Sequence, residues 1–215
     1  TIDGHDISTA ALEAKRLIGY LPEGAPSYGD MTTLEFLRFI AQVRGFRGVE
    51  IGQKVDQVIN EVALQTVRDQ SIETLSKGFK RRVGLAQAIM HDPKVLILDE
   101  PTDGLDPNQK HHVRALIKSL AADKIVIIST HILEVVAAVC SRAVIIANGK
   151  IVADGTPSEL ESQSRFHQAI RVTLTDSHDL VADLATLPGV ASVEVEEDNR
   201  LAYTIFAEGG ASIFS

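Results

Sequence analysis

The sequence has little cysteine, few aromatic residues and no long apolar run. Of its 215 residues one is cysteine, Cys140, none is tryptophan, and aromatic residues make up 5%. A lone cysteine excludes an internal disulfide, so we expect a reducing compartment. No stretch approaches the roughly 18 consecutive apolar residues that a membrane-spanning helix needs. The first residues also lack the basic and apolar regions of a signal peptide, so we expect none there.

Basic residues are scarce in the last third of the chain. Residues 1–153 carry 18 acidic and 18 basic side chains, whereas residues 154–215 carry 11 acidic and 3 basic ones. Because this tail holds the whole net charge of −8, we predict a domain boundary near residue 154. The balance argues against nucleic acid as a main partner, since a phosphate backbone requires a basic face. We interpret the short basic run at residues 80–82 as the solvated side of a helix.

The hydrophobic pattern predicts an α/β domain with a mostly parallel sheet. Buried strands are expected at residues 17–21, 95–98 and 125–128, and an apolar hairpin at 143–153 turns at Asn148 and Gly149. Thr32 and Glu35 have capping-box spacing at the start of one helix. Helical spacing recurs near residues 55–63, 83–89, from 107 onward and at 133–137. Residues 24–92 therefore form a helical block inserted into a strand-based plan.

The tail has a pattern of its own. We predict a strand at residues 170–174, a helix at about 178–186 and strands at 190–195 and 201–206. Residues 209–212 start a further element that the sequence does not finish. We therefore expect a partial accessory α/β module over residues 166–215.

Two carboxylates and a histidine follow predicted buried strands. Asp99 and Glu100 end the strand at 95–98, where open α/β sheets place their ligands. One carboxylate can hold Mg²⁺ while its neighbour polarises a water for attack on phosphate, although a plain acidic turn has the same residues. His131 follows the strand at 125–128, which as a parallel neighbour would bring it to the same edge. A lone histidine there is more often a satisfied polar residue, but its matching position favours a shared site.

Two further segments place short polar residues at the start of a helix. Ser76 and Gly78 precede one helix, and a serine hydroxyl with glycine amides at a helix N-terminus is a receptor for phosphate. Plain N-capping by Ser76 explains the same residues without a ligand. The loop at 101–107 is rich in turn residues, and Asp106 stands where it would cap the helix that starts at Pro107.

Taken together, these motifs resemble the nucleotide-binding subunit of ABC transporters over residues 1 to about 160. The resemblance implies a P-loop NTPase of ABC type that binds ATP with Mg²⁺ and hydrolyses it. It also implies two partners, a transmembrane permease that contacts the helical block and a second ATPase subunit. The chain itself would lie in the cytoplasm, at the cytoplasmic face of the membrane. Residues 20–23 and 75–82 are similar to the exporter-type bacterial group of gliding-motility and copper-processing ATPases, whose members often carry an extra C-terminal α/β module.

The resemblance further implies a role for each site residue. Asp99 matches the Walker B aspartate that supports Mg²⁺, Glu100 the general base, and His131 the switch histidine that contacts the γ-phosphate. Asp106 falls in the D-loop, which communicates across the ATPase dimer. Glu23 stands where the family usually has the Q-loop glutamine, and its carboxylate is still able to ligate Mg²⁺. The signature motif, usually Leu-Ser-Gly-Gly-Gln, corresponds here to Leu75, Ser76, Lys77, Gly78 and Phe79.

Two features depart from the family. Lys77 and Phe79 differ from the usual signature residues, and the Walker A loop Gly-x-x-x-x-Gly-Lys-[Ser/Thr] does not occur in the 215 residues. In the family this loop lies upstream of a strand that residues 1–4 would form. We therefore expect a fragment without its Walker A region and its C-terminal end, which on its own is incompetent for ATP binding.

Two other functions stay open beside an ATPase that drives an exporter. A soluble ABC-type ATPase acting on ribosomes or DNA would usually show two cassettes, a basic linker or long coiled-coil arms, and this acidic single-cassette sequence shows none. A non-enzymatic product would bind a partner subunit without turnover. The intact Glu100 and His131 argue against decay of the parent protein.

Overall fold

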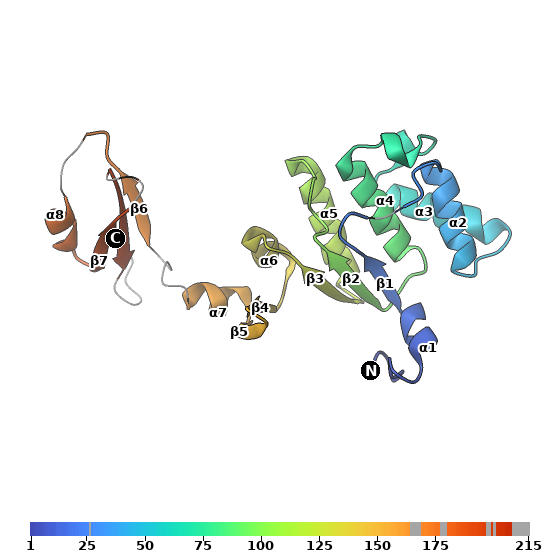
Figure 1. Cartoon of the computed structure of the whole chain (residues 1–215), viewed down its shortest axis with the longest axis horizontal. Coiled ribbons are helices and arrows are strands. Elements are labelled where there is room, and N and C mark those ends of the chain that lie inside the picture. The colour runs from blue at the N-terminus through green and yellow to red at the C-terminus, as the bar shows by residue number, and fades with distance from the viewer. Residues whose placement is uncertain (26, 164–168, 177–179, 197–198, 200, 208–215) are drawn as a thin grey trace. The chain divides into compact units, whose positions relative to one another are not determined.

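A computed structural model describes the chain except for residues 26, 164–168, 177–179, 197–198, 200 and 208–215 (Figure 1). The chain divides into two compact units, Thr1–Val139 and Cys140–Ser215, which are described separately below. The domain limits expected from the sequence, 1–160 and 166–215, stay predictions.

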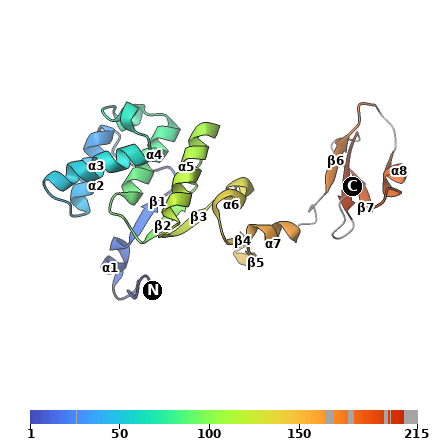
Figure 2. The same ribbon diagram turned by 180° about the vertical axis from the view of Figure 1, so that it is seen from behind.

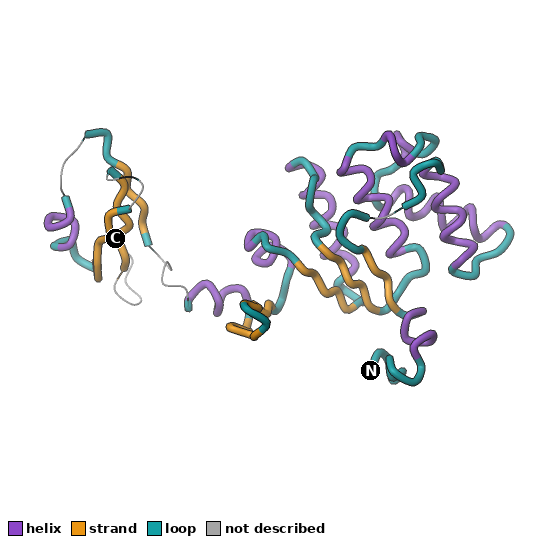
Figure 3. Tube along the Cα trace, viewed as in Figure 1, coloured by secondary structure: helices purple, strands orange, loops and turns teal. Residues whose placement is uncertain are grey.

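The first unit is built on three parallel strands, β1 (Ile18–Leu21), β2 (Val95–Asp99) and β3 (Ile125–Ser129), in the order β1-β2-β3. The register pairs Leu21 with Leu98 and Leu98 with Ile128, so the carboxyl ends of all three strands meet at one edge. Figure 3 shows these strands side by side among helices of the same unit. The predicted parallel α/β core is confirmed.

One face of this sheet is better covered than the other among the described residues. Leu96 and Leu98 are completely buried, and they join a core with side chains of α4 (Lys77–Ile89) and α5 (Pro107–Leu120). On the alternate positions, Ile125 and Ile127 are 64% and 53% exposed, and Tyr20 is 49% exposed. The predicted buried strands at 17–21 and 125–128 are therefore covered on one face only, while the strand at 95–98, predicted to be buried on both faces, alternates between buried and partly buried residues. Successive side chains of a strand point to opposite faces, and α4 and α5 line one of them (Figures 1 and 2).

The helical block between β1 and β2 is confirmed. It contains α2 (Thr33–Val43), α3 (Val49–Glu61), two short 3₁₀ turns (Gln65–Val67 and Ile72–Thr74) and α4. The capping box at the start of α2 is present: Thr32 Oγ1 accepts from the Glu35 amide at 3.2 Å, and Glu35 Oε2 accepts from the Thr32 amide at 2.8 Å. Since α2, α3 and α4 pack together in one core with Leu21 and Leu98, the block is anchored to the sheet.

The N-terminal segment differs from the expectation. Residues 1–4 form a tight turn instead of a strand, because Ile2 and His5 exchange backbone hydrogen bonds of 2.8 and 2.9 Å. Asp3 and Gly4 both have positive φ angles, +47° and +82°, and these angles reverse the chain direction between Ile2 and His5. A short helix that the periodicity did not reveal, α1 (Ala11–Arg16), then leads into β1.

The last helix of the first unit is α6 (Leu133–Val139), which follows β3. The second unit begins with the hairpin of β4 (Ala143–Ala147) and β5 (Lys150–Gly155), which turns at Asn148 and Gly149 as predicted. α7 (Pro157–Ser162) starts with a capping box at Thr156 and Glu159. None of the helices among the described residues is long and apolar enough to cross a membrane.

The tail folds as a small antiparallel sheet. Its strands β6 (Ile170–Thr173), β7 (Val190–Val195) and β8 (Ala202–Ala207) lie in the order β6-β8-β7, with α8 (Val181–Ala185) between β6 and β7 in sequence. The predicted strand-helix-strand-strand order is confirmed. The start of the helix predicted at 178–186 and the element predicted from 209 lie outside the described residues.

Candidate active site

The candidate site lies where the three parallel strands end. Glu23 is exposed in the turn after β1, Asp99 is the last residue of β2, and Ser129, its register partner, is the last residue of β3. Open α/β sheets bind ligands at this edge. The sequence-predicted residues that follow β2 and β3 are thus brought together.

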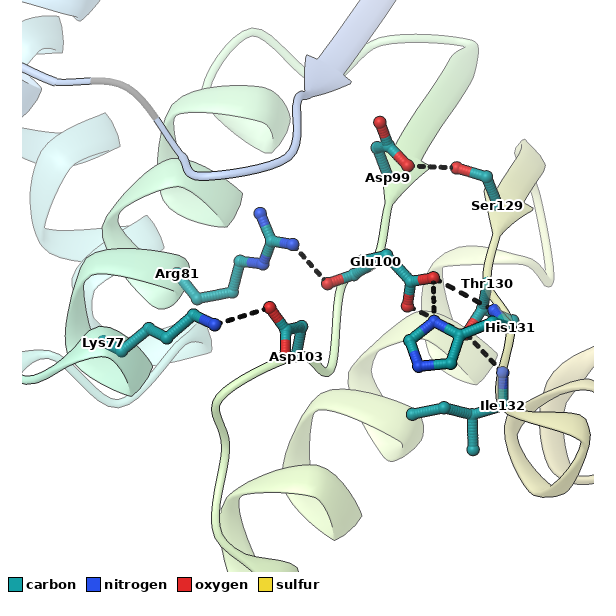
Figure 4. A network of polar contacts seen from close by, with 9 residues as sticks. All are labelled: Lys77, Arg81, Asp99, Glu100, Asp103, Ser129, Thr130, His131 and Ile132. Carbon is teal, nitrogen blue, oxygen red and sulfur yellow. Dashed lines mark hydrogen bonds and ion pairs between the residues drawn. The ribbon is translucent and has the colours of Figure 1, made fainter.

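Glu100 and His131 are in direct contact at this edge (Figure 4). His131 Nδ1 lies 2.6 Å from Oε1 of Glu100, and the His131 amide donates to the same oxygen at 3.0 Å. Thr130 Oγ1 donates to the other carboxylate oxygen at 3.0 Å. The Glu100 side chain is 16% exposed, whereas the His131 ring is 77% exposed and accessible to a ligand. The predicted placement of His131 beside the acidic pair is confirmed.

These contacts set the charge of Glu100. Burial works to raise the pKa of its carboxyl, but the donors of His131 and Thr130 outweigh burial and hold that pKa below its ordinary value. The residue also has a left-handed backbone, with φ +46°, while its amide donates to the Ser129 carbonyl at 2.9 Å. Glu100 is therefore an ionised carboxylate in a fixed orientation, so it is able to accept a proton, and its lowered pKa makes it a weaker base than an ordinary glutamate.

Asp99 presents the second carboxylate. Ser129 Oγ donates to its Oδ1 at 2.5 Å, which orients the carboxylate at the end of β2. Carboxylate and hydroxyl oxygens are the hard ligands that Mg²⁺ prefers, so the donor chemistry of Asp99 and the nearby Glu23 fits that ion. The described residues contain no preformed group of three or more histidine, cysteine or carboxylate ligands. A phosphate ligand and water would complete such a coordination shell.

The segment expected to be the signature motif starts α4. Ser76 is the N-cap, and its Oγ accepts from the Phe79 amide at 3.3 Å. Gly78 is closely packed, since a Cβ there would stand 2.5 Å from Gln109 Oε1, the end of a flexible side chain, and 3.2 Å from Leu105. Leu75 is buried in the core just before the helix. The start of α4 is therefore pressed against the loop that follows β2.

The loop from 101 to 106 is held from both sides. Asp106 caps α5, because its Oδ1 accepts from the Gln109 amide at 2.8 Å. Lys77, a residue that departs from the family signature, pairs with Asp103 at 2.8 Å. Phe79, the other departure, lies under Arg82 with 5.3 Å between the guanidinium carbon and the ring centroid.

The interpretation of residues 80–82 as a solvated helix side is wrong. Arg81 is 4% exposed and Arg82 is 8% exposed. Arg82 Nη1 donates to the Ala63 carbonyl at 3.1 Å, and Arg81 donates to backbone carbonyls that follow β1 and β2. Sequence reasoning missed Arg81 and Thr130 as neighbours of the site, because their partners are a backbone carbonyl and a residue 30 positions away.

Comparison with known proteins agrees with this geometry. The sequence profile described as "ABC transporter" matches residues 1–103. The uncharacterized ABC transporter ATP-binding protein YxlF of Bacillus subtilis is 34% identical over 89% of this chain and 64% of its own length. The linearmycin resistance ATP-binding protein LnrL of the same organism is 34% identical over 92% of this chain and 64% of its own length. The chain thus spans about two thirds of these curated relatives.

Solved structures show the same fold. An ATP-binding subunit of an ABC transporter matches 76% of this chain and 68% of its own, with TM-score 0.67 and 29% identity. The structure of cbiO1 from Clostridium perfringens, part of the complex cbiONQ, matches 72% of this chain and 62% of its own, with TM-score 0.64 and 26% identity. The fold is that of the ABC-type P-loop ATPases. Residues 1–103 match the ABC transporter family model, and the chain is similar to ATP-binding subunits of that family.

Proposed function

We propose that this chain supplies the catalytic-carboxylate and signature parts of an ATP-hydrolysing subunit that drives an ABC exporter. The observation that carries the proposal is the contact of Glu100 with His131 at the edge where Asp99 ends β2. The similarity to a linearmycin resistance ATP-binding protein supports export as the direction of transport. The specific group proposed is the exporter-type group related to gliding-motility and copper-processing ATPases.

Each residue has a proposed task in this reaction. Asp99 and Glu23 would hold Mg²⁺, which when bound neutralises phosphate charge. Glu100 accepts the proton of the attacking water, because its carboxylate is ionised and oriented. The exposed face of the His131 ring lies beside it, where a γ-phosphate contact is accessible.

The signature side serves a second subunit in this proposal. Ser76 and Gly78 present a hydroxyl and the N-terminal amides of α4, a helix of 13 residues, to a phosphate held by the facing subunit. Leu75 anchors this start in the core, and Lys77 and Phe79 complete the motif in place of the usual residues. Asp106 lies in the loop that would cross to the partner. The active form is therefore a dimer of ATPase subunits on a transmembrane permease, at the cytoplasmic face of the membrane.

The phosphate cradle is proposed to lie outside these residues. No Gly-x-x-x-x-Gly-Lys-[Ser/Thr] pattern occurs among the 215 residues, and backbone amides of that loop supply most phosphate contacts in P-loop proteins. We infer that the chain on its own does not bind ATP with useful affinity. The carboxylates and the signature helix would then act only within the longer protein.

The decisive experiment compares the complete protein alone, with its permease in vesicles, and with ribosomes or DNA. Exporter function predicts ATP hydrolysis that the reconstituted permease stimulates, and no stimulation by ribosomes or DNA. Stimulation by ribosomes or DNA alone would favour the soluble ATPase, and an absence of hydrolysis in every mixture would favour a non-enzymatic partner-binding protein. The acidic balance of the chain speaks against nucleic acid as the partner.

A further inference from the structure

Two cations on α4 reach the segment that follows β2. Lys77 and Arg81 are four residues apart on the helix, so their side chains share one face. Lys77 Nζ lies 2.8 Å from Asp103 Oδ2, and Arg81 Nη2 donates to the backbone carbonyl of Glu100 (Figure 4). One face of α4 thus contacts the segment after β2 at two residues, Glu100 and Asp103.

Arg81 makes a second contact that extends this link. Its Nη1 donates to the carbonyl of Pro22 at 2.8 Å, in the turn that carries Glu23. A single guanidinium therefore joins α4 to the chain segments that follow β1 and β2. A buried cation is costly unless it is hydrogen-bonded and faces opposite charge. Burial lowers the pKa of Arg81, and four surrounding carboxylates act in the opposite direction, namely Asp103, Asp99, Glu100 and Glu23.

The backbone of Glu100 explains why such a contact matters. A residue with a side chain is strained at φ +46°, and such conformations persist only where the surroundings determine them. The Glu100 amide is held by the Ser129 carbonyl, its carboxylate by His131 and Thr130, and its carbonyl by Arg81. Arg81 therefore restrains the carbonyl side of the one residue whose orientation the proposed reaction depends on.

We propose that Arg81 is a positioning residue that keeps the Glu100 carboxylate directed at His131, with the Lys77–Asp103 pair as a second link one turn earlier. The proposal rests on the proposed role of Glu100 as general base. Because Ser76 caps the N-terminus of α4, the same contact connects the helix proposed to serve the facing nucleotide with Glu100, the proposed base of the chain's own site. A movement of α4 would therefore be transmitted to Glu100 through the Arg81 side chain.

The 215-residue chain allows a direct test that needs no turnover. The imidazole ¹⁵N chemical shifts of His131 report its contact with the Glu100 carboxylate. We expect Arg81→Gln to move the His131 shifts toward the values of a Glu100→Gln variant. Arg81→Lys, whose ammonium group reaches only one of the two carbonyls at a time, should move these shifts part of the way. Lys80→Gln is the matched control, since Lys80 lies on the same helix and donates to the Glu73 carbonyl at 2.9 Å. Wild-type shifts in a folded Arg81→Gln protein would overturn the proposal. If that variant does not fold, wild-type shifts in Arg81→Lys overturn it instead.

The complete ATPase gives the second readout. Misplacing a catalytic group by about 1 Å costs roughly 10²-fold in rate, so Arg81→Gln is expected to lower kcat by about that factor. KM for ATP should change much less than kcat, because Arg81 itself is not one of the groups proposed to contact the nucleotide or Mg²⁺. A wild-type kcat, or a rise in KM as large as the loss in kcat, contradicts a positioning role. If the wild-type protein hydrolyses no ATP, the proposed function fails, whereas the His131 shifts still decide the role of Arg81.

Discussion

Nδ1 of His131 lies 2.6 Å from Oε1 of Glu100, although the two residues are 31 positions apart in the sequence. The parallel pairing of β2 with β3 causes this contact, because Asp99 is the register partner of Ser129 and both chains continue past the same sheet edge. The contact joins a partly buried carboxylate to an exposed ring. A ligand that touches the ring is therefore able to influence the carboxylate directly.

The first prediction concerns this pair. His131→Ala removes the ring donor to Glu100, so the pKa of the Glu100 carboxyl should rise toward its ordinary value. Carboxyl ¹³C NMR of the 215-residue chain measures that shift. In the complete protein the same change should reduce ATP turnover by roughly 10²-fold or more. His111→Ala, an exposed histidine on α5, is the control. An unmoved Glu100 pKa in the His131 variant would contradict the contact.

The second prediction concerns stability and two glycines. A Cβ on Gly19 would stand 2.1 Å from the Ala88 backbone oxygen and 2.7 Å from Leu96, so β1 and α4 must separate in Gly19→Ala. Overpacking of this kind costs about 1–3 kcal/mol of unfolding free energy. Gly52, inside α3, has nothing within 4 Å, so Gly52→Ala should instead stabilise by about 0.5–1 kcal/mol. Urea denaturation measures the unfolding free energy of both variants. Equal changes in that free energy for Gly19→Ala and Gly52→Ala would refute the close packing at Gly19.

The third prediction concerns acid stability. His91 Nε2 lies 3.1 Å from the Ile18 carbonyl, and its Nδ1 is buried without a partner. Burial, with the charge of Arg44, lowers the pKa of His91 to about 4. The folded ring thus stays neutral while the unfolded ring takes a proton below about pH 6.5, so stability falls as the pH drops from about 6.5 to 4. The loss attributable to this residue is at most about 3 kcal/mol.

The measurement for His91 is the unfolding free energy between pH 4 and 7. His91→Gln keeps a donor for the Ile18 carbonyl but does not titrate, so its curve should be flatter than that of the wild type. His112→Gln, on the exposed side of α5, should leave the slope unchanged. Parallel curves for wild type and His91→Gln would show that His91 is not the source of the acid sensitivity.

The fourth prediction concerns nucleotide binding by this chain alone. Each charge-assisted hydrogen bond from a missing phosphate cradle is worth ~1.5–3 kcal/mol, so losing two weakens binding by roughly 10²–10⁴. Calorimetric titration of Mg²⁺–ATP into the 215-residue chain should show no micromolar affinity. Micromolar binding that survives Ser76→Ala would place a nucleotide site somewhere other than proposed.

Much of the site was predictable because it depends on strand ends. The apolar run before Asp99 and the one before His131 define two parallel neighbours, and a parallel pair has one carboxyl edge. The capping box at Thr32 and the turn at Asn148 were equally local, since each depends on residues within a few positions. Such local patterns can be identified from the sequence without knowledge of the tertiary structure.

Two of the errors concern what covers a surface. Arg81 and Arg82 were predicted to face solvent because the sequence shows their charge but not their acceptors. Those acceptors are backbone carbonyls of turns that are distant in sequence and lie beside the helix. Ile125 and Ile127 read as buried because an apolar strand does not show how many of its faces have helices against them. A further error concerns residues 1–4. The family resemblance predicted a strand there, but hydrogen bonds between Ile2 and His5 reverse the chain.

The most direct measurement of the central claim is ATP turnover and trapping in the complete protein with Glu100→Gln. An amide accepts no proton from the attacking water, so steady hydrolysis should disappear while ATP binding persists. Dimers with trapped ATP should then accumulate, as seen by size-exclusion chromatography with radiolabelled nucleotide. Asp123→Asn, an exposed carboxylate before β3 that pairs with Lys124, serves as the control and should retain turnover. Near-normal hydrolysis by the Glu100→Gln protein would contradict the account.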